Sequence, residues 1–158
     1  PKVKKLKFKA PKAEEMGIMM GIVAEDIYKI YFHGPAYQVL ESVQVDGNTA
    51  IGLLADKLPA NCNPANAPEF IAPRLVEFCF QTAGVWEIHT KQQMALPLAI
   101  GSVTAYRQEA EAKGKLYAIV EAVDDGAAFK AQVVDKSGNV FVELNGYRTV
   151  TLPGAVQL

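Results

Sequence analysis

The 158-residue sequence has few of the residues from which disulfide frameworks, metal sites and nucleic-acid surfaces are built. Its two cysteines, Cys62 and Cys79, lie in unlike surroundings, one in a polar loop and one in an apolar run. No CxxC pair or second ligand cluster accompanies them, so neither a disulfide framework nor a metal site is predicted. Sixteen Lys and Arg against 17 Asp and Glu leave a net charge of -1. This balance gives no overall field that would attract nucleic acid.

Long hydrophobic runs are also missing. No segment reaches the roughly 18 uninterrupted apolar residues of a membrane span, and the lysine-rich start is not followed by an apolar signal core. We therefore expect neither nucleic acid nor a membrane as a partner, and a reducing, cytoplasmic setting is the default expectation. The sequence begins at Pro1 without Met, which fits either removal of an initiator Met or excision from a longer polypeptide.

The composition and length of the sequence are those of one packed domain. Half of them are hydrophobic (50%) and 21% are charged, and the length suits a single core of ordinary size. Residues 1–26 begin with six lysines that alternate in part with apolar residues, a pattern typical of a basic arm or linker. Docking of this arm on an acidic partner is the functional alternative to a solvated arm. Residues 27–158 are predicted to form the domain.

Local patterns predict an α+β fold with one long helix. Residues 39–45 and 49–55 alternate around Asp46-Gly47-Asn48, as in a β-hairpin, and Pro73 begins an apolar stretch of helical spacing that reaches about Thr90. Further strand-rich segments are 96–106, 115–123, 127–135 and 140–152. A helix that is apolar on most sides is expected inside its sheet. The prediction is therefore a central helix wrapped by an antiparallel sheet of about five to six strands.

One carboxylate and one amide interrupt the apolar helix. Glu77 and Gln81 are four residues apart, which places them on one face, where the amide can hydrogen-bond to the carboxylate. A buried carboxylate favours its protonated form, which a general acid requires at neutral pH. An outward-facing Glu77 near the helix N-terminus is the structural alternative. The residues alone leave the two readings equally balanced.

The surrounding motif resembles a known family. The pattern Pro-x-Leu-Val-Glu-x-x-x-Gln-x-Ala-Gly at 73–84 is similar to the central-helix motif of the β-hydroxyacyl thioester dehydratases of fatty-acid and polyketide synthesis. These enzymes have the hotdog fold, in which a long helix is wrapped by an antiparallel sheet. The resemblance implies that Glu77 protonates the departing β-hydroxyl group and that Gln81 holds it in place.

A second motif resembles the same family. Residues 32–38, Phe-His-Gly-Pro-Ala-Tyr-Gln, are similar to the Gly-Pro element that opens the second, C-terminal hotdog of polyketide and polyunsaturated fatty-acid synthase dehydratase domains. The resemblance extends over residues 27–154, with both motifs in the family's order. It implies substrate-binding roles for the residues Phe32, Gly34, Pro35 and Tyr37.

The base of the family is missing from this sequence. In the double-hotdog domain a histidine of the first hotdog, within His-x-x-x-Gly-x-x-x-x-Pro, takes the α-proton, and neither His33 nor His89 stands in that motif. His33 is retained as a candidate base, whereas His89 is expected to be a charge at the helix end or a surface residue. The base would then come from a first hotdog, either upstream in the native polypeptide or on a separate chain. Because hotdogs pair edge to edge, we expect a homodimer or a pairing with a preceding hotdog half.

Two residues of the helix have an alternative structural reading. Trp86 is a candidate for the lining of an acyl tunnel, although a lone Trp on an apolar helix also suits the core. Cys79 is expected to be a small core residue, since nothing supplies the positive surroundings that a thiolate needs.

The resemblance implies a dehydratase half-domain that acts on β-hydroxyacyl thioesters. The substrate would be carried on the phosphopantetheine of an acyl carrier protein, with no metal or redox cofactor. Two alternatives stay open: a non-catalytic hotdog that binds acyl groups or serves as a scaffold, and a hotdog acyl thioesterase. An enoyl product would indicate the dehydratase and a free acid the thioesterase.

Overall fold

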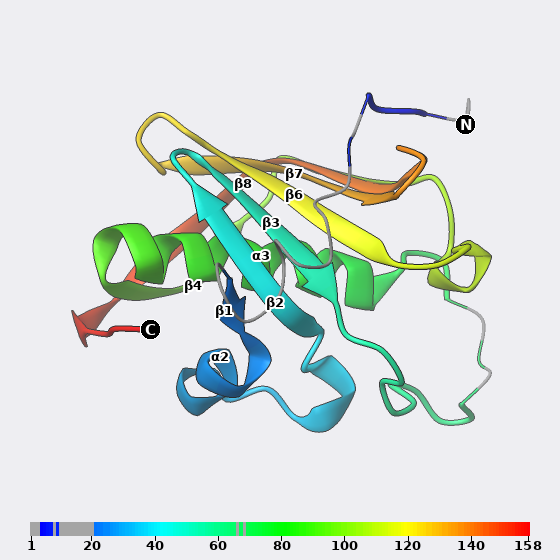
Figure 1. Cartoon of the computed structure of the whole chain (residues 1–158), viewed down its shortest axis with the longest axis horizontal. Coiled ribbons are helices and arrows are strands. Elements are labelled where there is room, and N and C mark those ends of the chain that lie inside the picture. Colours follow the sequence, from blue (N-terminus) through cyan, green and yellow to red (C-terminus); the bar gives the residue numbers. More distant parts are fainter. Residues whose placement is uncertain (1–3, 8, 10–20, 66, 68) are drawn as a thin grey trace.

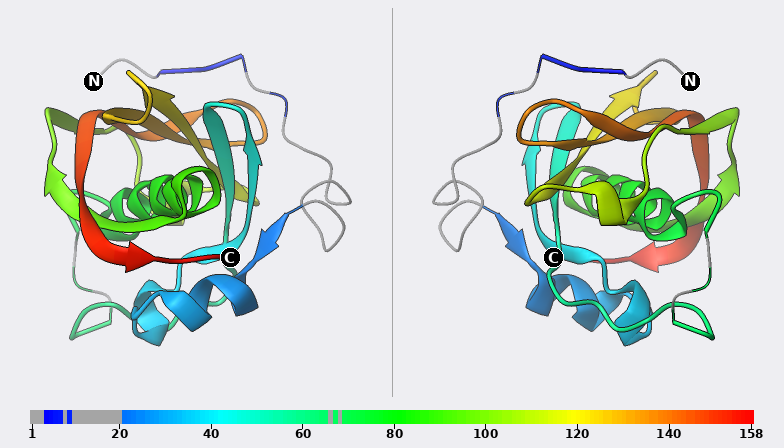
Figure 2. Two further views of the ribbon diagram at one scale, coloured as in Figure 1. Left: turned by 90° about the vertical axis from the view of Figure 1, so that its left-hand side faces the viewer. Right: turned by 90° about the vertical axis from the view of Figure 1, so that its right-hand side faces the viewer.

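A single long helix, α3 (Pro73–Lys91), runs along the concave face of a curved antiparallel sheet in the computed structural model of the protein (Figure 1). The structure describes residues 4–7, 9, 21–65, 67 and 69–158. Seen along the helix, the strands curl around α3 on several sides (Figure 2). The predicted central helix wrapped by a sheet, which is the hotdog arrangement, is thus confirmed.

The sheet has eight described strands in the order β1-β2-β3-β6-β7-β8-β4, with β5 paired to β8. Their bounds are β1 Ile22–Val23, β2 Leu40–Asp46, β3 Thr49–Leu54, β4 Gln93–Ala99, β5 Ser102–Ala105, β6 Leu116–Val123, β7 Ala128–Asp135 and β8 Val140–Ala155. A short helix α2 (Ala24–Ile30) and two 3-10 turns, η1 (Pro35–Tyr37) and η2 (Glu109–Glu111), complete the elements.

Helix α3 owes its bounds and its position to a few residues. Pro73 occupies the first turn, where its missing N–H group costs no hydrogen bond, and Gln92 ends the helix in the left-handed conformation with φ 54°. Gly52 of β3 faces the helix, and a Cβ at this position would collide with the side chain of Thr82. The absent side chain therefore lets α3 lie close to the sheet.

No helix among the described residues is long and apolar enough to cross a membrane.

The strand count is slightly higher than the five to six predicted, for a reason that lies in one segment. Residues 96–106 were expected to form a single strand, but the chain breaks at Gly101 into β4 and β5. The Gly101 N–H donates to the carbonyl oxygen of Asn145 in β8 at 3.1 Å. β8 is thereby paired along its first half with β5 and along its second half with β4. The short β1 adds one more strand beside β2.

Part of the predicted basic arm lies beside the turn between β7 and β8. The N–H of Leu6 donates to the Gly138 carbonyl at 2.7 Å, and the Val140 N–H donates to the Lys4 carbonyl at 3.1 Å. The Lys4 ammonium also forms an ion pair with Glu143 of β8. Residues 1–3, 8 and 10–20 of the arm lie outside the described residues, and the predicted border at 26/27 stays a prediction.

Candidate active site

Glu77 and Gln81 lie on one face of α3, as their spacing predicts. The Gln81 Nε2 donates to Glu77 Oε1 at 3.0 Å. Gln81 is only 2% exposed, whereas 23% of the Glu77 side chain is exposed. The carboxylate is therefore partly exposed, while the residue that holds it, Gln81, is almost fully buried.

His33 reaches the same carboxylate from the segment between α2 and β2. Its Nε2 lies 2.9 Å from Glu77 Oε1, and its ring stacks on Phe32 with centroids 5.3 Å apart. Gln38 Nε2 donates to the His33 carbonyl at 3.1 Å, which fixes the loop on which the ring stands. The other ring nitrogen, Nδ1, is buried and has no hydrogen-bond partner among the described residues. The two sequence motifs therefore meet at one oxygen atom.

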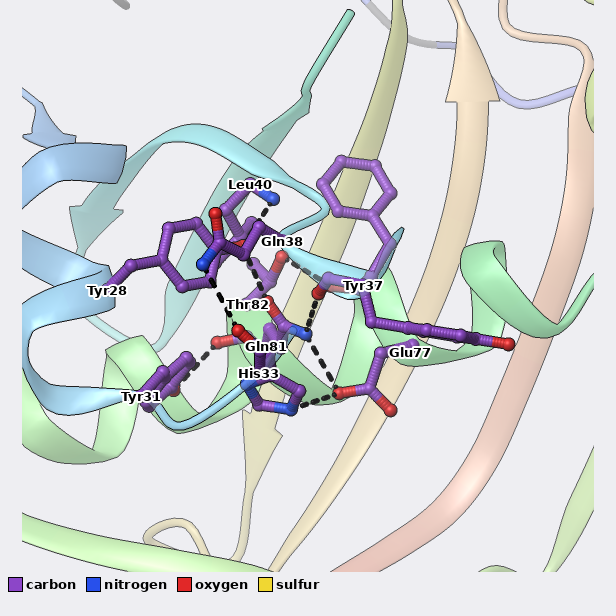
Figure 3. Close-up of polar contacts among 10 residues, drawn as sticks. Tyr28, Tyr31, His33, Tyr37, Gln38, Leu40, Glu77, Gln81 and Thr82 are labelled. Atoms are coloured by element: carbon purple, nitrogen blue, oxygen red, sulfur yellow. Dashed lines mark hydrogen bonds and ion pairs between the residues drawn. The ribbon is translucent and has the colours of Figure 1, made fainter. Parts of the chain in front are cut away.

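Gln81 is held by a network that reaches beyond the two motifs (Figure 3). Its Nε2 also donates to the Tyr37 carbonyl at 2.8 Å, and its Oε1 accepts from the Tyr28 hydroxyl at 2.8 Å. The Leu40 N–H donates to the same hydroxyl at 2.8 Å. Burial raises the pKa of Tyr28 above its usual value, so its hydroxyl keeps its proton at neutral pH.

A cavity of about 110 Å³ lies next to this network. Glu77, Gln81 and His33 share its wall with apolar side chains that include Phe80 and Leu96. The cavity is therefore apolar, with one cluster of polar groups at its wall, as in a site for a small organic group. A larger, open depression of about 560 Å³ lies elsewhere and includes none of these three residues.

Tyr31 and Gly84 form another part of the cavity wall. The Tyr31 hydroxyl donates to the Gln81 carbonyl at 3.1 Å, and burial raises its pKa well above the usual value. A Cβ at Gly84 would collide with the Tyr31 hydroxyl oxygen. The size of the cavity here depends on the absent side chain of Gly84 and on the fixed position of Tyr31.

The sequence did not single out Tyr28 or Tyr31 as site residues. The signal available was their spacing of three, with Tyr28 in the last turn of α2 and Tyr31 at its C-cap. Their partner, Gln81, is 53 and 50 positions away, respectively. Nothing local in the sequence connects residues at that separation.

The other predicted residues of the Gly-Pro element take different positions relative to the cavity. Phe32 lines the cavity, and Tyr37 contributes its carbonyl to Gln81. Pro35 begins η1, and Gly34 precedes it, outside the cavity wall.

Three helix residues lie away from the cavity. Trp86 is 2% exposed in the core, where its Nε1 donates to the Gly47 carbonyl at 2.9 Å. Its ring packs edge-on against Phe129. Trp86 therefore takes the core position, which was the alternative to a place in the lining of an acyl tunnel. Cys79 is buried and burial raises its pKa, so it is no reactive thiolate. His89 is exposed near the end of α3.

In the described part of the chain, no three His, Cys, Asp or Glu side chains are grouped so as to hold a metal ion.

A family model described as the polyketide synthase dehydratase N-terminal domain matches residues 25–158. The fold is similar to that of solved dehydratase domains. The domain from the CurF module of the curacin polyketide synthase is 22% identical with a TM-score of 0.72, and the match covers 95% of this chain and 53% of that one. A trans-AT polyketide synthase dehydratase domain from Brevibacillus brevis is 20% identical with a TM-score of 0.70, over 95% and 54% of the two chains. This chain thus spans about half the length of the dehydratase domains that it matches.

Proposed function

The chain belongs to the polyketide synthase dehydratase family, and on that premise we propose that it is the acid-bearing hotdog half of a dehydratase for β-hydroxyacyl thioesters. The matched model is described as the N-terminal domain, whereas the motifs at 32–38 and 73–84 resemble the second hotdog. The observation that favours the acid-bearing half is the cluster of Glu77, Gln81 and His33 at the wall of one cavity.

Glu77 is the proposed general acid. A β-hydroxyl group leaves as water when it receives a proton as its C–O bond breaks, and a positioned carboxylic acid can donate that proton. Glu77 Oε1 already contacts Gln81 and His33, so Oε2 is the oxygen that is open to a substrate. In the forward reaction the α-proton goes to a base, the C–O bond breaks, and the electron pair of the α-C–H bond forms the double bond.

The base is proposed to be a histidine from another hotdog, either a preceding half of the native polypeptide or a partner chain. What supports another source for the base is that neither His33 nor His89 stands in the histidine motif of the family. His33 is a second candidate because its Nε2 touches Glu77 and its Nδ1 has no partner among the described residues; since Nδ1 is buried, its loop would have to open for a substrate to reach it. With Nε2–H directed at Glu77, Nδ1 of a neutral imidazole carries the free electron pair.

The substrate is proposed to arrive as a thioester on the phosphopantetheine of an acyl carrier protein. The apolar part of the cavity, which includes Phe80 and Leu96, suits an acyl chain, and the polar cluster suits the hydroxyl group next to the thioester. The proposed reaction needs no redox cofactor, since loss of water is neither an oxidation nor a reduction, and it needs no metal, since Glu77 supplies the proton that the departing hydroxyl group requires.

The test is to give the purified chain, alone and together with a hotdog that carries the family's histidine motif, a β-hydroxyacyl pantetheine thioester, and to measure the enoyl product and the free acid by mass spectrometry. Glu77→Gln is expected to lower enoyl formation by about 100-fold or more, the usual contribution of a general acid. The matched control is Glu121→Gln, the same change at an exposed carboxylate of β6. Its rate should equal that of the wild type.

The remaining outcomes separate the alternatives. Enoyl formation by the chain alone would mean that the base lies within this chain, and its loss in His33→Gln would leave His33 as the candidate. If turnover appears only after a hotdog with the family's histidine motif is added, the base belongs to that partner. Free acid in place of enoyl product would indicate a thioesterase. If the chain binds the thioester but forms neither product, both when it is alone and when the partner hotdog is present, it is an acyl-binding module and the proposal is wrong.

A further inference from the structure

The side-chain amide of Gln81 takes part in hydrogen bonds whose directions are all determined. The Leu40 N–H donates to the Tyr28 oxygen, so the Tyr28 proton is available for a different acceptor. That acceptor is Gln81 Oε1, 2.8 Å away. The nitrogen of the amide must then face the other way, where it meets two acceptors, the Tyr37 carbonyl and Glu77 Oε1.

The opposite orientation of the amide would break several of these contacts. With oxygen and nitrogen exchanged, the amide oxygen would face the Tyr37 carbonyl, which has no proton to offer, and Glu77 Oε1, which has one only when the proton of the acid is on that oxygen. The NH₂ group would face the Tyr28 hydroxyl, whose own proton would then lose its acceptor, Gln81 Oε1. Since Gln81 is almost fully buried, water cannot repair the lost bonds. The Tyr28 hydroxyl therefore selects one orientation.

We propose that Tyr28 is a positioning residue, whose hydroxyl fixes the Gln81 amide and through it determines which oxygen of Glu77 can carry a transferable proton. The Gln81 N–H makes Glu77 Oε1 an acceptor, and so does the Nε2–H of His33. A carboxyl oxygen that accepts two hydrogen bonds is the poorer place for a proton, so the proton resides on Oε2. The acid thus presents one defined donor to the substrate.

This inference has a catalytic part, which rests on the proposed function, and a structural part, which does not. The structural part predicts that the Gln81 side-chain NH₂ protons lie near Glu77 and the Tyr37 carbonyl, away from the Tyr28 ring. The catalytic part predicts that loss of the Tyr28 hydroxyl lowers kcat without a comparable change of KM, because substrate contacts are kept while the acid loses its orientation.

The experiment compares the wild type, Tyr28→Phe and the control Tyr106→Phe, which removes a hydroxyl outside the cavity wall. Nuclear magnetic resonance of the Gln81 side-chain NH₂ group reports the amide, with nuclear Overhauser contacts in the wild type and exchange rates in all three proteins. Enoyl formation is measured in parallel, with a partner hotdog if activity requires one. We expect Tyr28→Phe to speed exchange of the Gln81 NH₂ protons and to lower kcat by about 10- to 100-fold, as for a misplaced catalytic group.

The possible outcomes test the structural part and the catalytic part separately. Contacts between the Gln81 NH₂ protons and the Tyr28 ring in the wild type would overturn the proposal, even if Tyr28→Phe did not fold. Unchanged Gln81 exchange in a folded Tyr28→Phe would overturn it as well, as would a rise in KM with kcat unchanged. If the amide responds as expected but the wild type forms no enoyl product under any condition, the structural part stands and the catalytic part fails together with the proposed function.

Discussion

The Nε2 of His33 and the Nε2 of Gln81 both lie within 3.0 Å of a single atom, Oε1 of Glu77. One nitrogen comes from the loop after α2 and the other from α3 itself, so two distant parts of the chain meet at this oxygen. Residues that act on one group as a unit do not contribute independently to a rate. The contact between His33 and Glu77 should therefore be visible as coupling.

A double-mutant cycle measures this coupling. We expect Glu77→Gln with His33→Gln to form the enoyl product at nearly the same rate as Glu77→Gln alone, because the second change removes a partner of a group that is already lost. The rates are measured under the conditions that support wild-type turnover. If the loss in the double variant equals the product of the two single losses, His33 and Glu77 act separately and the shared contact has no role in the reaction.

Gly84→Ala should restrict the acyl group and weaken the fold. The cavity of about 110 Å³ has room for about four carbon atoms, by comparison with a cavity of roughly 150 Å³ that binds benzene in another protein. The added methyl group must displace the Tyr31 hydroxyl, which we expect to cost about 1–3 kcal/mol of unfolding free energy. Denaturant unfolding measures this loss, and KM values for a series of acyl lengths should rise most for the longest chains.

Gly34→Ala is the matched control for stability. A Cβ at Gly34 meets nothing within 4 Å, and its φ of -69° with ψ of 163° suits any residue before a proline. We expect its unfolding free energy to stay within about 0.5 kcal/mol of the wild type. Equal losses in the two variants would show that the contact between Gly84 and Tyr31 is not the cause.

Glu87 should make stability depend on pH in the direction opposite to that of a paired carboxylate. It is a buried residue of α3 whose Oε1 accepts from the Thr149 hydroxyl at 2.7 Å, while Oε2 is buried without a partner among the described residues. Burial raises its pKa above the ordinary 4.5, although the Thr149 bond and Lys91 oppose this. The folded protein thus holds a proton that the unfolded chain releases, and its contribution to stability is lost as pH rises above about 4.5.

Glu87→Gln removes this dependence. We expect the variant to gain unfolding free energy relative to the wild type as the pH is raised from about 4.5 to about 7, since a neutral amide replaces a carboxyl group that loses its proton. Urea unfolding at several pH values gives the difference between the two proteins. A difference that is constant over this range would mean that Glu87 has the same pKa in the folded and unfolded states.

Gly138→Ala should release the described part of the basic arm. Gly138 has φ of 76°, in the left-handed region, and a Cβ there would collide with the carbonyl oxygen of Leu6. We expect faster hydrogen exchange at the Leu6 amide, which loses its bond to the Gly138 carbonyl, while amides of α3 keep their protection. Unchanged exchange at Leu6 would show that the arm holds its place without this contact.

Local patterns in the sequence were sufficient for the elements whose stability is local. The turn at Asp46-Gly47-Asn48 and the alternation beside it predicted the β2–β3 hairpin, and the spacing of apolar residues after Pro73 predicted α3. The pairing of Glu77 with Gln81 was predictable for the same reason, since four residues make one helical turn.

Contacts between distant segments account for what the sequence did not reveal. The break between β4 and β5 depends on the bond from Gly101 to Asn145, 44 positions later, and the place of Tyr28 depends on Gln81. The contact between His33 and Glu77 likewise joins two motifs that can be recognised separately but whose distance only the fold determines. The residues were visible in the sequence, whereas their assembly was not.

The long strand β8 has a consequence for how the chain folds during synthesis. It pairs with β7 and β5 along its first half and with β4 along its second half. It therefore connects β4 to the rest of the sheet that surrounds α3. Until residues 140–155 have left the ribosome, the strand that separates β7 from β4 is absent and the apolar helix cannot be fully enclosed. A nascent chain that ends before this point exposes hydrophobic surface of the kind that chaperones bind. We therefore expect enclosure of the helix to be a late event in synthesis of the domain.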